Sequence, residues 1–73
     1  MKVKIAKETG YWALNLCPWG GDFRRLDEDF EGEIYMIYEQ KDGCPIKFSV
    51  KLEDGTIAGF QYLGNKDIQF KED

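Results

Sequence analysis

The densest group of chemically active side chains is a run of carboxylates in the first half of the chain. Residues 22–33 read Asp-Phe-Arg-Arg-Leu-Asp-Glu-Asp-Phe-Glu-Gly-Glu, and they hold six acids and two arginines, a formal charge of −4. The rest of the 73-residue chain holds eight acids and eight bases, so this segment accounts for the whole net charge of −4. Carboxylates at this density can bind a cation, transfer protons or attract a basic partner.

Part of the acidic run matches the spacing of a calcium-binding EF-hand loop. Asp27, Asp29 and Glu31 occupy the first, third and fifth positions, and Gly32 occupies the sixth. The twelfth position of such a loop is a bidentate Glu, but in this chain it is Tyr38. We therefore expect no metal site, and we expect no cofactor.

Several kinds of catalysis are excluded or disfavoured. The chain has no histidine, which excludes Ser-His-Asp and Cys-His nucleophiles and every histidine metal site. Carboxylate pairs hydrolyse glycosides, but a domain of this size leaves little room for a substrate cleft of ~300–1,000 Å³. Cys17 and Cys44 are too few for a structural zinc site; we expect reduced thiols, with a disulfide between them as the alternative. We predict no catalytic residues and no enzyme.

An aromatic segment precedes the carboxylates. Trp19 lies between Pro18 and two glycines, which places it in a loop, and an aromatic residue and two arginines follow closely. Trp and Arg are enriched at binding hot spots, so we predict a partner-binding surface here. The alternatives are that Trp19 folds back over the core and that the acidic run is simply a solvated loop. The predicted partner-binding residues are Trp19, Phe23, Arg24, Arg25, Asp27, Glu28, Asp29 and Glu31.

Short segments with alternating apolar and polar residues must position this surface. The alternation predicts strands near residues 2–7, 11–16, 33–39, 46–52, 56–63 and 68–70. Asp42-Gly43 and Asp54-Gly55 are typical of hairpin turns. Within residues 11–16 we expect Trp12, Leu14 and Leu16 to face the core and Tyr11, Ala13 and Asn15 to face solvent. Gly59 is expected to mark a bulge or a sharp bend.

Residues 17–32 are predicted to be a long loop between these strands. Phe23, Leu26 and Phe30 have the i, i+3, i+7 spacing of a helical stripe, and Asp22 is a suitable N-cap, so we expect one helical turn in the loop. A curled hairpin loop is the alternative. About five to six short antiparallel strands, curled into a small barrel, would cover the hydrophobic face of the sheet and leave few open edges. The predicted fold class is mainly β, with one domain over residues 1–73.

The second half of the chain carries a recognisable pattern. It contains Ile34-Tyr35-Met36-Ile37-Tyr38-Glu39, then Phe48-Ser49-Val50-Lys51-Leu52-Glu53-Asp54-Gly55, and finally Phe60 and Phe70. Over residues 33–73 this pattern resembles the small SH3-like barrel proteins of bacteria and phages. The resemblance implies a fold and carries no function with it. The Ala-Leu-Tyr-Asp-Tyr signature of polyproline-binding SH3 domains is missing, so no binding residue follows from the resemblance.

These observations favour a cytoplasmic binding protein. No run approaches the ~18 apolar residues of a membrane span, and the alternating start of the chain is unlike a signal peptide. We expect a non-enzymatic protein-binding module, a monomer or weak dimer, whose acidic and aromatic loop binds a partner with a basic surface. A phage or mobile-element accessory protein that inhibits a host nucleic-acid-handling protein fits this pattern. The alternative is a single-stranded nucleic-acid-binding small barrel, which would use Tyr11, Tyr35, Tyr62, Lys2, Lys4, Lys47 and Lys51.

Overall fold

The computed structural model describes residues 1–15 and 21–71, which form eight β-strands and no helix. The strands are β1 (Lys2–Ile5), β2 (Gly10–Ala13), β3 (Asp22–Arg25), β4 (Phe30–Glu33), β5 (Met36–Lys41), β6 (Cys44–Lys51), β7 (Ile57–Gln61) and β8 (Ile68–Lys71). In these residues there is accordingly no helix with the length and apolar character needed to cross a membrane. The mainly β prediction is confirmed, but eight strands replace the five to six expected.

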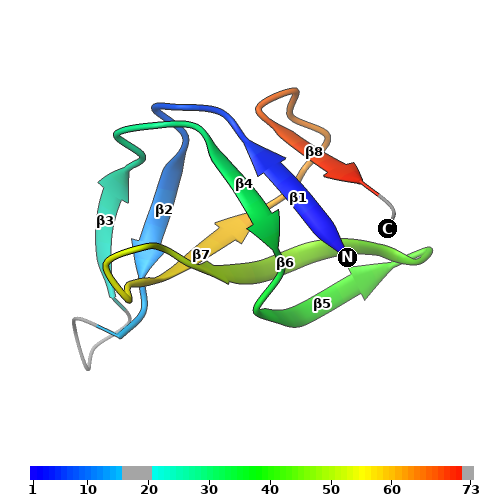
Figure 1. The fold of residues 1–73 in the computed structure, drawn as a ribbon. Coiled ribbons are helices and arrows are strands. Elements are labelled where there is room, and N and C mark those ends of the chain that lie inside the picture. Colours follow the sequence, from blue (N-terminus) through cyan, green and yellow to red (C-terminus); the bar gives the residue numbers. More distant parts are fainter. Residues whose placement is uncertain (16–20, 72–73) are drawn as a thin grey trace.

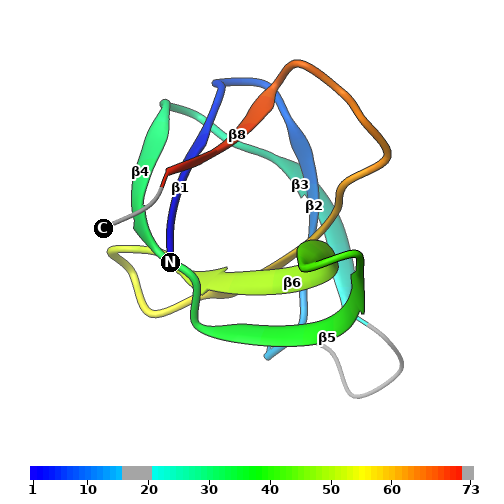
Figure 2. The ribbon, with the colours of Figure 1, turned by 90° about the vertical axis from the view of Figure 1, so that its right-hand side faces the viewer.

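The strands form two antiparallel sheets (Figures 1 and 2). The smaller sheet has the order β4-β1-β8, and the larger has the order β3-β2-β7-β6-β5. The two sheets meet where β4 leads into β5. There the Ile34 N–H donates to the Met1 carbonyl at 3.0 Å and the Tyr35 N–H donates to the Ser49 carbonyl at 2.7 Å.

The hydrophobic core takes side chains from both sheets. Phe48 of β6 is fully buried, and its ring stacks on Phe60 of β7 with 5.8 Å between centroids. The same ring meets Phe70 of β8 edge-on at 5.5 Å, so Phe48 contacts both sheets. Alternation in residues 46–52 predicts Ile46, Phe48, Val50 and Leu52 inward and Lys47, Ser49 and Lys51 outward, and in residues 56–63 it predicts Ala58, Phe60 and Tyr62 on one face. Phe48, Val50, Ala58 and Phe60 are buried as predicted, but Ser49 is fully buried as well. The buried core consists of Val3, Ile5, Tyr11, Ala13, Leu26, Phe48, Val50, Ala58, Phe60 and Ile68.

The prediction of a long loop with one helical turn over residues 17–32 is wrong for the described part of that range. Residues 22–25 form β3, which pairs with β2, and residues 30–33 form β4, which pairs with β1. Leu26 and Phe30 do pack on the core, whereas Phe23 is exposed. The spacing of Phe23, Leu26 and Phe30 is therefore compatible with a helical turn and also with the two strands that form. Strand pairing takes up the backbone hydrogen bonds that a helix would have made within the segment.

β2 turns the opposite face to the core from the one expected. Tyr11 and Ala13 are buried, whereas Trp12 is 50% exposed and Leu14 lies at the surface. Leu16 lies outside the described residues. The prediction of which side chains of this strand face the core is therefore wrong, although the predicted range of residues overlaps the observed strand.

The turn before β2 sets this phase. Glu8 has a φ of 75°, in the left-handed region, and the Thr9 hydroxyl donates to the Ala6 carbonyl at 2.7 Å. Because side chains alternate between the two faces of a strand, a shift of one residue in this turn exchanges the faces completely. Alternation within residues 11–16 gives no information about that shift.

Gly59 does not mark a bulge. It pairs in register with Trp12 on one side and with Ser49 on the other. A Cβ built at Gly59 would lie 3.1 Å from Leu14 Cδ1, so the glycine leaves room for the Leu14 side chain. The register shifts of the larger sheet lie in β5 instead, between Ile37 and Gln40.

Both predicted hairpin turns are confirmed. Asp42 and Gly43 join β5 to β6 with φ values of 54° and 78°, the paired left-handed conformation that favours tight hairpins. Gly55, with a φ of 90°, turns β6 into β7. The second turn carries two further carboxylates, Glu53 and Asp54, to the side of the molecule where the acidic segment lies.

The inverted face of β2 can be tested with two neighbouring substitutions. Tyr11→Ala removes a buried ring and should lower the free energy of unfolding by about 3 kcal/mol. Trp12→Ala removes a half-exposed ring and should cost about 1 kcal/mol. Urea denaturation measures both values, and a Tyr11→Ala chain already unfolded in buffer would agree with the expectation. A larger loss for Trp12→Ala would contradict the observed phase.

Candidate functional site

A cleft of about 520 Å³ is lined by residues of the β3–β4 connection and of the β6–β7 turn. Its lining combines apolar and aromatic side chains with charged ones, and the charged ones come from both segments. We term this feature the acidic cleft. The lining residues are Tyr11, Leu26, Asp27, Glu28, Asp29, Phe30, Glu31, Lys51, Leu52, Glu53 and Asp54.

The charge of the acidic cleft is strongly negative. Six carboxylates and one ammonium group line it, which gives a formal charge of −5. Asp27, Glu28 and Glu53 make no ion pair with any residue of the described part of the chain. Their negative charge is therefore directed to solvent and is available to a cationic ligand.

The other three carboxylates of the cleft are held by hydrogen bonds. Asp29 Oδ1 accepts the Lys7 backbone N–H at 2.7 Å, which ties the β3–β4 connection to the end of β1. Asp54 Oδ1 accepts the Thr56 N–H at 2.9 Å, and this bond lowers the pKa of the Asp54 carboxyl. Glu31 Oε1 accepts from the Lys71 ammonium at 3.1 Å, which lowers the pKa of Glu31. Asp54 and Glu31 are therefore held ionised at neutral pH.

The calcium-loop spacing of the acidic run is not assembled into a metal centre. Across residues 1–15 and 21–71 no group of three or more His, Cys, Asp or Glu side chains is placed to hold a metal ion. Asp29 and Glu31 instead bond to Lys7 and Lys71, on different elements. Strand β4 begins inside the twelve-residue span and straightens the backbone that an EF-hand loop would have to wrap around the ion.

The structure divides the predicted partner-binding residues between two places. Asp27, Glu28, Asp29 and Glu31 line the acidic cleft together. The aromatic and basic residues of the prediction lie on β3 and line no part of the cleft: these are Phe23, Arg24 and Arg25. Trp19 lies outside the described residues, so its predicted role stays a prediction.

The β3 side chains make contacts of their own. The Phe23 ring meets Trp12 of β2 edge-on, with 4.9 Å between centroids. Arg24 Nε donates to Asp22 Oδ2 at 2.9 Å, and this hydrogen bond raises the pKa of the Arg24 guanidinium. Arg25 Nη1 donates to the Glu8 carbonyl at 3.1 Å. The Phe23 ring thus packs outside the acidic cleft, whereas Arg24 interacts electrostatically with Tyr11 and Asp54 of the cleft lining.

Several residues that line the cleft were not predicted from the sequence. Glu53 and Asp54 belong to a turn that the Asp-Gly signal located correctly, but nothing local indicated that this turn faces the acidic run. Tyr11 was expected on the solvent side of its strand. It is instead part of the buried core and contributes to the cleft lining. Only pairing between distant strands brings these residues together.

The expectation that so small a domain leaves no room for a sizeable cleft is wrong. At about 520 Å³ the acidic cleft falls within the ~300–1,000 Å³ range of small-molecule sites. Its walls come from turns at the ends of strands, so it does not have to be hollowed out of the core. A general acid at neutral pH requires a raised carboxyl pKa, whereas the shifted carboxyls here, Glu31 and Asp54, have lowered ones.

The residues of the nucleic-acid alternative do not form one surface. Tyr11 is buried, and Tyr62 packs edge-on against Phe70 at 5.0 Å. The lysines fall on two different sheets. Lys2 and Lys4 lie on β1 opposite Glu33 and Glu31, and Lys47 lies on β6 with its amine 3.9 Å from Glu39.

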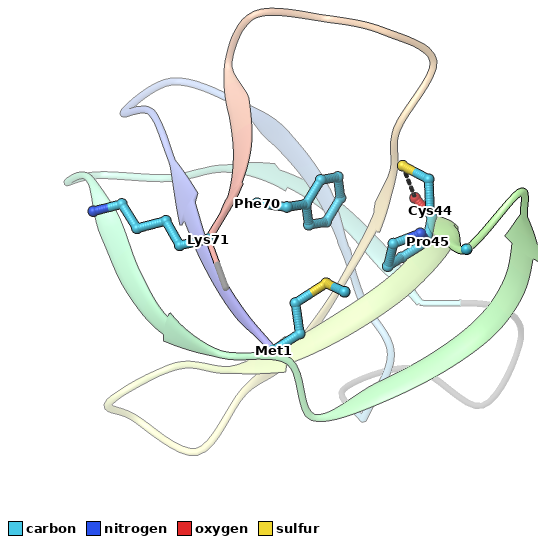
Figure 3. A pocket seen from close by; sticks show the side chains of 6 residues that line it. Met1, Cys44, Pro45, Phe70 and Lys71 are labelled. Carbon is cyan, nitrogen blue, oxygen red and sulfur yellow. Dashed lines mark hydrogen bonds between the residues drawn. The ribbon is translucent and has the colours of Figure 1, made fainter. Parts of the chain in front are cut away.

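A second, smaller pocket of about 220 Å³ lies beside β8 and the start of β6 (Figure 3). Met1, Pro45 and Phe70 point toward one another across it, while the Lys71 side chain points away. Cys44 is half-buried, and its Sγ lies 3.8 Å from the Pro45 carbonyl oxygen. Cys17 lies outside the described residues. This pocket is below the usual size of a ligand site.

No protein-family model, curated protein or solved structure matches the chain. The likeness of residues 33–73 to SH3-like barrel proteins therefore stays a prediction. The acidic cleft has to be interpreted from its own geometry and charge.

The depressed pKa of Asp54 predicts a pH-dependent part of the stability. A carboxyl whose pKa is lower in the folded state stabilises the fold above its unfolded pKa, and this stabilisation is lost as the pH falls through the folded value. Asp54→Asn keeps an acceptor for the Thr56 N–H but cannot titrate. Thermal denaturation between pH 6 and pH 2 should therefore show a smaller fall in Tm for Asp54→Asn than for the unsubstituted protein. Equal falls in Tm would contradict the expectation.

Proposed function

We propose that this protein is a non-enzymatic binding module that takes up a basic segment of a partner protein in the acidic cleft. The observation that carries the proposal is the convergence of six carboxylates from two segments far apart in the sequence on one cleft. Like charges repel, so such a cluster is stabilised when a cationic partner neutralises it.

The mixed lining of the acidic cleft suits lysine and arginine side chains in particular. These side chains carry a long apolar stem below a charged head. Phe30 and Leu52, both half-buried, offer apolar surface for the stem. Asp27, Glu28 and Glu53, which make no ion pair within the described residues, offer carboxylates for the head. Arg can bind a carboxylate through two parallel hydrogen bonds, which makes an arginine-bearing segment the best match.

We extend the proposal to the class of partner. Proteins that handle nucleic acids carry basic grooves that bind phosphate charges spaced along a strand. A small domain with several unpaired carboxylates at one end can occupy such a groove and block it. This supports the role of a phage or mobile-element accessory protein that inhibits a nucleic-acid-handling protein of its host.

The SH3-like barrel belongs to the same proposal. The hydrogen bonds from Ile34 and Tyr35 join the β4–β5 connection to Met1, next to β1, and to Ser49 of β6, as a curled single sheet would require. Glu8 and Leu26 make a second such corner, where the Glu8 N–H donates to the Leu26 carbonyl at 3.0 Å. The strand pairings themselves stay divided into two sheets.

The binding proposal can be tested with a fluorescein-labelled peptide of alternating arginine and serine, followed by fluorescence anisotropy. Asp27→Lys combined with Glu28→Lys reverses two unpaired charges of the cleft. This double variant should bind the peptide about 10- to 100-fold more weakly at 50 mM salt, which corresponds to about 1.4–2.8 kcal/mol. Raising the salt should weaken binding to the unsubstituted protein as well, because exposed charges are screened.

The matched control is Glu33→Lys combined with Glu39→Lys, which changes the net charge equally at exposed sites outside the cleft. It should weaken binding by no more than about threefold. Equal losses for the two double variants would show attraction by net charge alone and would refute the cleft. An oligonucleotide that binds in place of the peptide would favour the nucleic-acid alternative.

A further inference from the structure

The two sheets end in four edge strands, and these edges differ in their suitability for pairing with a second copy. Self-pairing of β4 would place Glu31 opposite Glu33 of the other copy, and like charges directly opposite each other are destabilising. β5 contains register shifts that disrupt a regular edge. β8 offers Gln69 and Lys71, which are not complementary in charge. β3 carries an acid and a base two residues apart, as β5 does with Glu39 and Lys41, but the pairing of β3 has no register shift.

The side chains of β3 are arranged so that an antiparallel copy complements them. Asp22 and Arg24 lie on one face of the strand, two residues apart, and Phe23 lies on the other. All four residues of β3 are exposed, and the Asp22 and Arg24 side chains keep 56% and 46% of their accessible surface. A second β3 running antiparallel about a two-fold axis at Phe23 places Asp22 of each copy opposite Arg24 of the other, so that pairs between the copies can replace the Asp22–Arg24 pair within each copy.

The backbone N–H and C=O groups of β3 point in the directions that this pairing requires. The Leu14 N–H donates to the Ile57 carbonyl at 2.9 Å, so the even-numbered residues of β2 bond to β7 and the odd-numbered ones to β3. The register of β2 and β3 then directs the backbone groups of Asp22 and Arg24 toward β2. The N–H and C=O of Phe23 and Arg25 point to the open side, where a two-fold axis at Phe23 requires them.

The Phe23 ring leaves this edge uncovered. It leans toward β2, because a Cβ at Gly10 would lie 2.5 Å from Phe23 Cζ, and it packs on Trp12. Joining two copies at β3 would place the two Phe23 side chains next to each other on the outer face. The Trp12–Phe23 pairs of the two copies would then form one continuous aromatic row across the joined sheet.

From this geometry we infer that the protein self-associates through β3 into a two-fold dimer with a continuous ten-stranded sheet. Charge selects the register of the pairing. A shift of the axis by one residue to Arg24 would oppose the Arg24 side chains of the two copies, whereas the axis at Phe23 makes two Asp22–Arg24 pairs between the copies. The contact is short, so the dimer belongs to the weak, transient class of interfaces.

Analytical ultracentrifugation at protein concentrations up to about 1 mM tests this inference, since a contact with a Kd in that range is still detected there. The unsubstituted protein should shift from monomer to dimer as its concentration rises. Asp22→Arg places two arginines on each β3, and Arg24→Asp places two aspartates there. Each variant alone should dimerise at least tenfold more weakly, whereas an equimolar mixture of the two should form a one-to-one heterodimer.

The matched controls are Lys66→Asp and Asp67→Arg, which change charge equally on the exposed β7–β8 connection. They should leave the monomer–dimer equilibrium unchanged, and their mixture should show no preferred heterodimer. A thermal melt of each variant, with Tm within about 4 °C of the unsubstituted value, confirms that it folds. A protein that stays monomeric at 1 mM overturns the inference. A dimer insensitive to both β3 substitutions, or no heterodimer on mixing, overturns it as well.

Discussion

The contact of Phe48 with aromatic rings from both sheets is the interaction on which the rest of the structure depends. Its ring stacks on Phe60 within the larger sheet and meets Phe70 of the smaller sheet edge-on. A 73-residue chain buries only about 60% of its unfolded surface, so few side chains are available to hold the sheets together. Burial of this ring provides apolar area and aromatic geometry at the same place. The turns that carry charged residues are anchored to this core at their strand ends.

The acidic cleft shows how a small fold accommodates concentrated negative charge. Five of its carboxylates lie on turns and connections and Glu31 lies on β4, and solvent screens their mutual repulsion; three of the six also make hydrogen bonds that stabilise the fold. Asp29 bonds to the Lys7 backbone, Asp54 closes its own hairpin through Thr56, and Glu31 pairs with Lys71. The other three carboxylates make no ion pair with residues 1–15 or 21–71. Residues that fix the walls of the cleft are thus separate from those available to a ligand, and binding need not disturb the turns.

The small size of the domain also leaves the edges of its two sheets open. Eight short strands in two sheets leave four edges, and each edge presents unpaired backbone groups. Repulsive glutamates on β4 and register shifts in β5 discourage pairing at those two edges. The self-complementary charges of β3 have the opposite effect. Arg24 of β3 interacts electrostatically with Tyr11 and Asp54 of the acidic cleft, so the edge of β3 adjoins the cleft.

The sequence by itself determined the strands whose alternation is uninterrupted and whose turns are local. Residues 46–52 alternate and an Asp-Gly hairpin joins them to residues 56–63, so the inward positions of Phe48, Val50, Ala58 and Phe60 followed from a period of two and from turn chemistry, whereas the burial of Ser49 did not. The acidic character of residues 22–33 was equally a property of composition, and four of its carboxylates do line one cleft.

Only the tertiary structure decided the phase of β2 and the conformation of residues 22–33. The φ of Glu8 and the Thr9–Ala6 hydrogen bond set that phase, and no pattern within the strand records them. Phe23 and Phe30 lie on strands because β2 and β1 supply their hydrogen-bonding partners from elsewhere in the chain. The same pairings bring Glu53 and Asp54 to the acidic run. Strand pairing is a contact between distant segments, so local composition and periodicity cannot specify it.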